Sequence, residues 1–189
     1  MYYLVAIALS LCVAYFLIFK VFSVFFGENN AGISRRAVLS VAMIFVFAWL
    51  GYTVTFLIPD LETGNRVLHL FVGGFLGTLI CFLVVKDGGF KISRIQFFIM
   101  SLLIVTALGA FNEHMEYFLQ TYVRYLFYSN PKDTWLDLLS NTTGILFGNA
   151  CLLPFLNRTG KEIVLVSCDE KTNDQGDNIY DSQGGGIHR

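Results

Sequence analysis

The sequence predicts an all-α integral membrane protein with five transmembrane helices. Two observations lead to this fold class. Hydrophobic residues make up 55% of the chain and charged residues only 14%, whereas soluble domains usually carry about 25% charged residues. The apolar residues also gather in five long runs separated by short polar segments. A helix needs roughly 20 apolar residues to cross a bilayer, so each run is a candidate span.

The first two runs make up the N-terminal part of the chain, residues 1–58. Residues 2–26 are apolar apart from Lys20, whose long side chain can reach toward an interface. No basic residue precedes this run and no clear cleavage site follows it, so a retained helix is favoured over a signal peptide. Four spans after a cleaved first segment are the alternative. Residues 37–58 form the second span, which Pro59 ends.

Three further runs lie within residues 59–156, the expected core of the protein. The third span is expected over residues 67–85 and carries His69 near its start. Small residues follow within two turns, which allows a neighbouring helix to approach closely. These are Gly73, Gly74 and Gly77. The fourth helix is expected over residues 95–127, leaving the hydrocarbon near Asn112 and continuing as an amphipathic extension.

The fifth span is expected over residues 133–155, with Asp133 or Thr134 as its N-cap. Polar and small residues recur there at spacings of three or four and therefore share one stripe of the helix. They are Asp133, Asp137, Asn141, Gly144 and Gly148. Attraction of carboxylates to the start of a helix explains Asp133 well, but it does not explain Asn141 two turns deeper.

Residues 157–189 differ in composition from the rest of the chain. They contain six carboxylates, four basic residues and a run of three glycines, which predicts a disordered tail. Lysine and arginine are concentrated in the first and third loops and at the start of this tail. The positive-inside rule therefore places the N-terminus outside and the tail in the cytoplasm.

This orientation brings polar groups from the last three spans to one depth on the outer side. They are His69, Glu113, Glu116, Asp133, Asp137 and Asn141. Ionisable groups at such positions are costly and usually functional. In one interpretation Glu113 is a catalytic base, and His69 with Asp137 orients the substrate. Candidate substrate-binding residues are Arg66, Glu116, Asp133 and Asn141.

Two other interpretations of the same polar groups remain open. His69, Glu113 and Asp137 can together bind a divalent cation. Imidazole with carboxylate suits zinc or manganese, and carboxylates with water suit magnesium or calcium. Alternatively, the groups form a structural lock, hydrogen-bonded between helices. His114 points about 100° away from Glu113 and is the weakest member of the set.

Three short motifs resemble the VanZ-like membrane proteins and the related YjdF-type proteins. N-R-V-L-H-L-F-V-G-G (residues 65–74) is similar to the family's D-[KR]-x-x-H box, although Asn65 stands where that box has Asp. N-E-H-M-E-Y-F-L-Q (residues 112–120) resembles its E-x-x-[EQ] helix. D-T-W-L-D-L-L-S-N-T-T-G (residues 133–144) resembles its D-x-x-x-D-x-x-x-N-x-x-G box. The resemblance covers roughly residues 60–150.

The resemblance implies a bacterial plasma membrane, a cell-envelope setting and a link to glycopeptide (teicoplanin) resistance. An envelope lipid or glycan precursor is then the expected partner, together with the bilayer. The net charge of -1 gives no indication of nucleic-acid binding. The chain contains no GxSxG, P-loop, HExxH or dinucleotide fingerprint. The sequence therefore leaves open whether the protein is an enzyme, and it leaves the oligomeric state open as well. A non-catalytic transporter subunit or envelope modulator is the alternative function.

Overall fold

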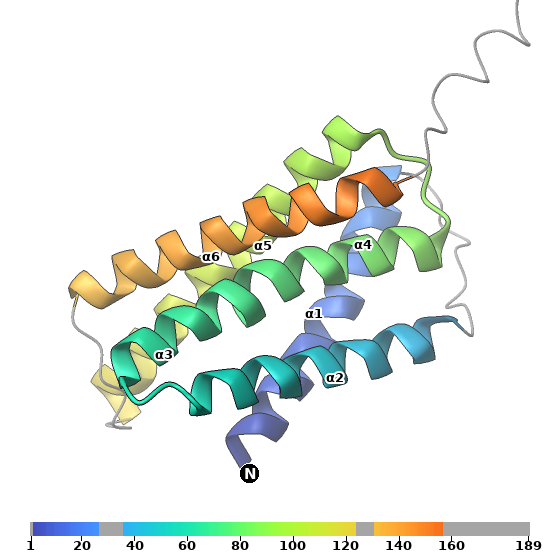
Figure 1. The fold of residues 1–189 in the computed structure, drawn as a ribbon. Coiled ribbons are helices and arrows are strands. Elements are labelled where there is room, and N and C mark those ends of the chain that lie inside the picture. Colours follow the sequence, from blue (N-terminus) through green and yellow to red (C-terminus); the bar gives the residue numbers. More distant parts are fainter. Residues whose placement is uncertain (1, 27–35, 124–130, 157–189) are drawn as a thin grey trace, which may run out of the picture. The chain divides into compact units, whose positions relative to one another are not determined.

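The computed structural model describes residues 2–26, 36–123 and 131–156, and every regular element in these ranges is a helix (Figure 1). Five segments are long and apolar enough to cross a membrane. They are Leu9–Phe26, Arg36–Phe56, Leu61–Gly88, Arg94–Phe118 and Thr134–Phe155. The all-α fold with five candidate spans is thus confirmed. The chain divides into two compact units, Met1–Asn157 and Arg158–Arg189, and the second lies outside the described residues.

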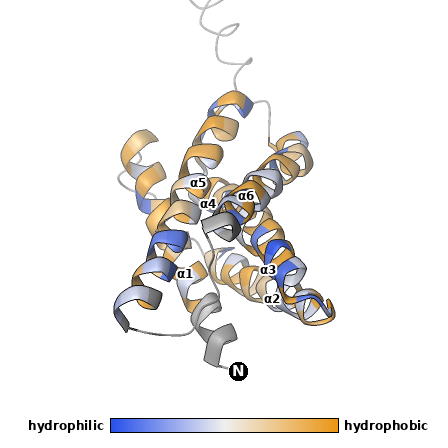
Figure 2. Cartoon of the chain, turned by 90° about the vertical axis from the view of Figure 1, so that its left-hand side faces the viewer, coloured by the Kyte–Doolittle hydropathy of each residue, from blue (hydrophilic) through white to orange (hydrophobic). Residues whose placement is uncertain are grey.

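Helices α1 (Tyr2–Phe26) and α2 (Arg36–Phe56) pack against each other and against α4 (Leu76–Gly88). The hydroxyl of Tyr15 on α1 donates a hydrogen bond of 2.7 Å to Asp87 of α4, and Phe22 is fully buried against the ring of Phe90, which follows α4. The outer faces of α1 and α2 expose many large apolar side chains. Figure 2 shows that hydrophobic residues cover much of the helices, whereas hydrophilic residues form smaller groups, one of them on α3. A water-soluble protein rarely exposes so much apolar surface, whereas a bilayer accepts it. The chain is therefore described as an integral membrane protein.

The third span starts earlier than the sequence predicted. It is one continuous rod made of α3 (Leu61–Leu68), the π-helix η1 (His69–Phe75) and α4. Asp60 caps it by accepting a hydrogen bond from the backbone N–H of Thr63, and Glu62 pairs with Arg66 one turn later. These local bonds stabilise a helix in a polar segment that lacks the apolar run on which the prediction rested.

The π-helix η1 makes the closest helix–helix contact, with α6 (Pro131–Leu152). A Cβ added to Gly74 would lie 2.2 Å from the carbonyl oxygen of Asn141, and one added to Gly144 would lie 2.1 Å from that of Leu70. Backbone therefore meets backbone at this crossing, as the glycines of the third span predicted. A π-helix is rare and is frequently found at a functional site.

The last two spans also differ in detail from the prediction. Helix α5 (Arg94–Phe118) starts with a capping box of Ser93 and Gln96 and continues into the π-helix η2 (Leu119–Val123). The predicted end at residue 127 lies outside the described residues. Helix α6 begins at Pro131, followed by the 3₁₀-helix η3 (Leu153–Phe155). The N-cap assignment to Asp133 or Thr134 is therefore wrong. Both lie in the first turn, because proline at the first helical position needs no N–H partner.

Candidate functional site

Three of the predicted side chains meet near one end of the last three spans. His69 comes from η1, Glu113 from α5 and Asp137 from α6, and all three are buried. One nitrogen or oxygen atom from each lies within 4.8 Å of the others. His69 is the first residue of the π-helix and follows two turns of α3, whereas Glu113 and Asp137 lie within two turns of a helix end. We call these residues the His69 cluster.

The imidazole of His69 lies between the two carboxylates. Its Nδ1 is 3.8 Å from Oε1 of Glu113, and its Nε2 is 3.5 Å from Oδ2 of Asp137. Both separations exceed the usual N–H···O hydrogen-bond length of about 3 Å. They are short enough for strong electrostatic attraction in a buried setting when the ring is protonated. The arrangement can stabilise a protonated ring, move a proton between two carboxylates, or accept a cation.

Asn65 belongs to the same site, although the sequence analysis did not include it among the site residues. Its Nδ2 donates a hydrogen bond of 2.9 Å to Oδ2 of Asp137. Asn65 precedes His69 by four residues, so both side chains lie on one face of the rod. That spacing was the available signal. The sequence analysis left Asn65 out because the VanZ-like box has Asp at this position. An asparagine lacks that acid, but its amide can donate a hydrogen bond.

Asn141 lies one turn from Asp137 on the same face of α6, and only 3% of its surface is exposed. Its Oδ1 has no hydrogen-bond partner among the residues that the structure describes. Gly73 and Gly109 make room for its amide, because a Cβ on Gly73 would lie 1.9 Å from Oδ1 and one on Gly109 3.0 Å from Nδ2. A buried carbonyl oxygen without a donor is costly, so a ligand group is a natural partner for it.

The other predicted residues lie around the cluster or apart from it. Glu116 accepts a hydrogen bond of 2.7 Å from Asn112 on the same helix. Arg66 forms its ion pair with Glu62 on an exposed part of α3. Nothing can be said of the Asp133 side chain, which lies outside the described part of the structure. His114 is exposed, and its ring contacts the carbonyl oxygen of Ala110 at 2.7 Å. This agrees with the prediction that His114 points away from Glu113.

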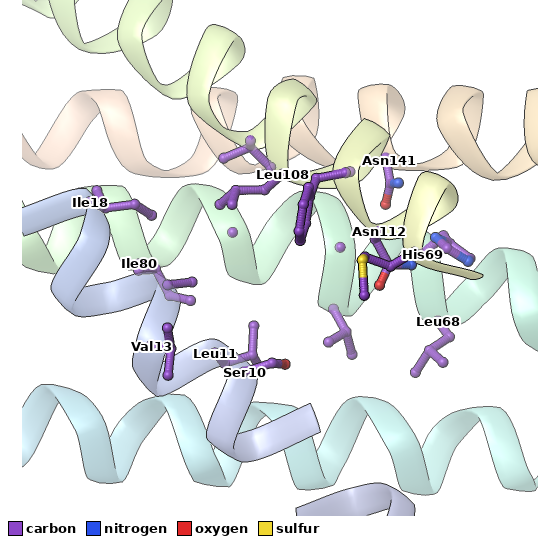
Figure 3. A pocket seen from close by; sticks show the side chains of 18 of the residues that line it. Ser10, Leu11, Val13, Ile18, Leu68, His69, Ile80, Leu108, Asn112 and Asn141 are labelled. Atoms are coloured by element: carbon purple, nitrogen blue, oxygen red, sulfur yellow. The ribbon is translucent and has the colours of Figure 1, made fainter. Parts of the chain in front are cut away.

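A cavity of about 610 Å³ begins beside this cluster. Figure 3 shows His69, Asn112 and Asn141 at one end of it and Ile18 and Ile80 toward the other. The polar end is completed by Asn65 and Glu116, and the remaining wall is mostly apolar. Helix α1 supplies much of that wall, mainly through apolar side chains together with Ser10. The sequence could not predict this role, because α1 is an apolar span with no charged residue lining the cavity.

Comparison of the chain with protein-family models, with curated proteins and with solved structures found no match. The resemblance to VanZ-like proteins consequently stays a prediction drawn from three short motifs. The functional argument below therefore depends on the geometry of the His69 cluster and of the cavity beside it.

Proposed function

We propose that the protein is a VanZ-like protein of the bacterial plasma membrane that binds an envelope lipid. The head group lies at the His69 end of the cavity, and an acyl chain lies along its apolar wall. The observation that carries this proposal is the change of polarity along one cavity, from His69 and Asn141 to Ile18 and Ile80. An amphipathic ligand matches both parts of such a wall, whereas a free sugar or ion leaves the apolar part unsatisfied.

Access from the bilayer supports a lipid rather than a water-soluble ligand. Val13 and Leu17 on α1 line the cavity and are each 57% exposed. Phe111 on α5 also lines it and is 63% exposed. These are lipid-facing positions in a membrane helix, so the cavity opens sideways between α1 and α5. A lipid can then enter without leaving the hydrocarbon.

The setting of the site follows from the sequence. The loop rule for lysine and arginine puts the His69 end on the outer side of the membrane, where envelope lipids and their glycan-bearing precursors are exposed. In a catalytic version of the proposal, Glu113 is the base while His69 and Asp137 orient the head group. Glycopeptide (teicoplanin) resistance is the physiological role that the family resemblance implies.

A structural lock is the second candidate, and one observation favours it. The imidazole of His69 contacts a carboxylate on either side, and Asn65 donates to Asp137, so the cluster joins three helices by itself. The lock predicts that His69→Ala lowers the stability of the protein and leaves lipid binding unchanged. The lipid proposal predicts a change in the lipid that is bound.

Photo-crosslinking with a phospholipid that carries a photoactivatable acyl chain tests the proposal. Ala14 lines the cavity, so Ala14→Trp fills its apolar part and is expected to lower labelling of the purified protein at least fivefold. Val24→Trp is the matched control, because Val24 lies on the same helix, is 75% exposed and does not line the cavity. Equal labelling of the two variants would mean that the lipid is bound elsewhere and would overturn the proposal.

A further inference from the structure

We propose that His69, Glu113 and Asp137 hold a divalent transition-metal cation, zinc or manganese, at the polar end of the cavity. The proposed role of this ion is to bind the anionic head group of the lipid, and in that respect the inference rests on the proposed function. The binding of the ion itself rests only on the geometry of the His69 cluster. One imidazole and two carboxylates form the donor set, and all three residues are buried. Mixed nitrogen and oxygen donors favour these metals over calcium or magnesium.

The spacing of the donor atoms is close to what a small cation requires. Metal–ligand bonds of about 2.0–2.1 Å in a tetrahedral site place neighbouring ligand atoms roughly 3.3 Å apart. One donor atom from each of the three residues lies within 4.8 Å of the other two. Small side-chain rotations are therefore enough to bring the donors onto one ion. The ligands also come from three separate helices, so the ion would cross-link them.

A single ion uses only one nitrogen of His69. The opposite nitrogen then carries the proton, and metal-bound histidines commonly use that N–H as a hydrogen-bond donor. One atom from each of His69, Glu113 and Asp137 lies within 4.8 Å of the other two, so both carboxylates can reach an ion bound to one nitrogen. Asn65 fixes Asp137 through its 2.9 Å hydrogen bond. Loss of either carboxylate is therefore expected to weaken ion binding.

A second observation points to a ligand at the same place. Oδ1 of Asn141 is buried, has no partner within the described ranges, and belongs to a side chain that lines the cavity beside His69. A metal-bound water or a head-group hydroxyl would supply the donor that this oxygen lacks. His69 also lines the cavity, so an ion on this ring has an open position facing the ligand. Three protein ligands with an open fourth position are typical of a functional rather than a structural zinc site.

Metal analysis and thermal unfolding of the purified full chain test this inference. We expect about one equivalent of metal per chain, a melting temperature that falls by several degrees with chelator, and recovery when zinc or manganese is added. His69→Ala and Asp137→Asn should lack both the metal and the chelator response. His114→Ala and Glu62→Gln are matched controls that should keep both, because these residues are exposed and lie outside the cluster.

A melting curve that chelator and added metal leave unmoved in the wild type would overturn the inference and leave an imidazole that bridges two carboxylates without an ion. If His69→Ala fails to fold, X-ray absorption of the metal-loaded wild type decides: nitrogen and oxygen donors support the site, and sulfur donors overturn it. The two proposals fail separately. Lipid labelling that responds to Ala14→Trp without any bound metal refutes the ion alone, whereas bound metal with no such response refutes the lipid cavity alone.

Discussion

Two buried polar clusters lie on α6, and they are built differently. The one nearer the C-terminal end of α6 joins Ser101 of α5 to Asn149, whose Oδ1 accepts a hydrogen bond of 3.1 Å from the serine hydroxyl. The Nδ2 of Asn149 donates to the carbonyl oxygen of Ile145 at 3.0 Å. Both side chains are neutral, and each is bonded to protein groups. The His69 cluster consists instead of ionisable groups beside a cavity.

The difference shows what a lock between membrane helices requires. Ser101 and Asn149 meet that requirement without a formal charge, and their hydrogen bonds close on the protein. A lock near the other end of α6 could have used the same neutral chemistry, because side chains from three helices meet there as well. Burying carboxylates carries a much larger desolvation cost than burying an amide or a hydroxyl. That extra cost is the physical reason to assign function to the His69 cluster and structure to the Ser101–Asn149 pair.

Gly144→Ala is expected to break both clusters and to have the largest effect. The new Cβ would lie 2.1 Å from the carbonyl oxygen of Leu70 and 2.9 Å from the Cα of Gly74, so the helix backbones must move apart. We expect a loss of about 3 kcal/mol in the free energy of unfolding, measured by denaturant titration in mixed micelles. Gly51→Ala is the control. Its Cβ meets a methyl group of Val72 at 2.8 Å, and a side chain shifts more easily than a backbone. Equal losses would show that the crossing of η1 and α6 is not the critical contact.

Asn149→Leu is expected to disrupt the Ser101–Asn149 pair and to leave the His69 cluster intact. It removes the interhelical hydrogen bond to Ser101 while keeping the approximate volume of the side chain. The expected loss is about 1 kcal/mol in the free energy of unfolding, as for other hydrogen bonds between membrane helices. Lipid labelling and metal content should stay at their wild-type values. A drop in either would mean that the Ser101–Asn149 pair contributes to the ligand site and that the two clusters do not differ in function.

Much of the fold could be predicted from the sequence because bilayer thickness imposes a simple rule on apolar run length. The start of the third span could not, because residues 61–66 are mostly polar and become helical through the Asp60 cap and the pair of Glu62 with Arg66. The π-helix that begins at His69 could not be predicted from the apolar pattern either. Nothing in its apolar composition distinguishes hydrogen bonds to the fifth residue from those to the fourth.

The candidate site could be predicted in part, for a similar reason. The stripe on the fifth span put Asp137 and Asn141 on one face, and the structure brings Asp137 to His69 and Glu113. Those positions follow from helical spacing. The contribution of α1 to the cavity does not, since it depends on how whole helices pack, and apolar residues on a membrane helix face lipid and protein alike. Asn65 could be predicted only in part. Its spacing from His69 can be read from the sequence, but its hydrogen bond to Asp137 depends on how the helices pack.

Asp60→Asn is expected to have the smallest effect on stability, because it changes a carboxylate that is solvated rather than buried. It therefore serves as a comparison for the buried carboxylates of the His69 cluster. Hydrogen bonds from the hydroxyl and backbone N–H of Thr63 hold the pKa of Asp60 below its ordinary value of 3.8. A depressed folded-state pKa means that the charged cap stabilises α3 fully above that ordinary value and loses its effect as the pH falls through the lower one. Asparagine keeps an oxygen acceptor but no charge. The melting temperature of the variant should therefore lie slightly below that of the wild type near neutral pH, and the gap should close as the pH falls below about 4. A gap that widens in acid would show that this carboxylate does not act through its charge.

Metal content and the chelator response of Asp60→Asn should be unchanged at neutral pH, since Asp60 lies outside the His69 cluster. Loss of the metal in this variant would instead mean that acidic residues near the start of the third span attract cations in general, and the distinction between a buried site and a solvated carboxylate would no longer hold.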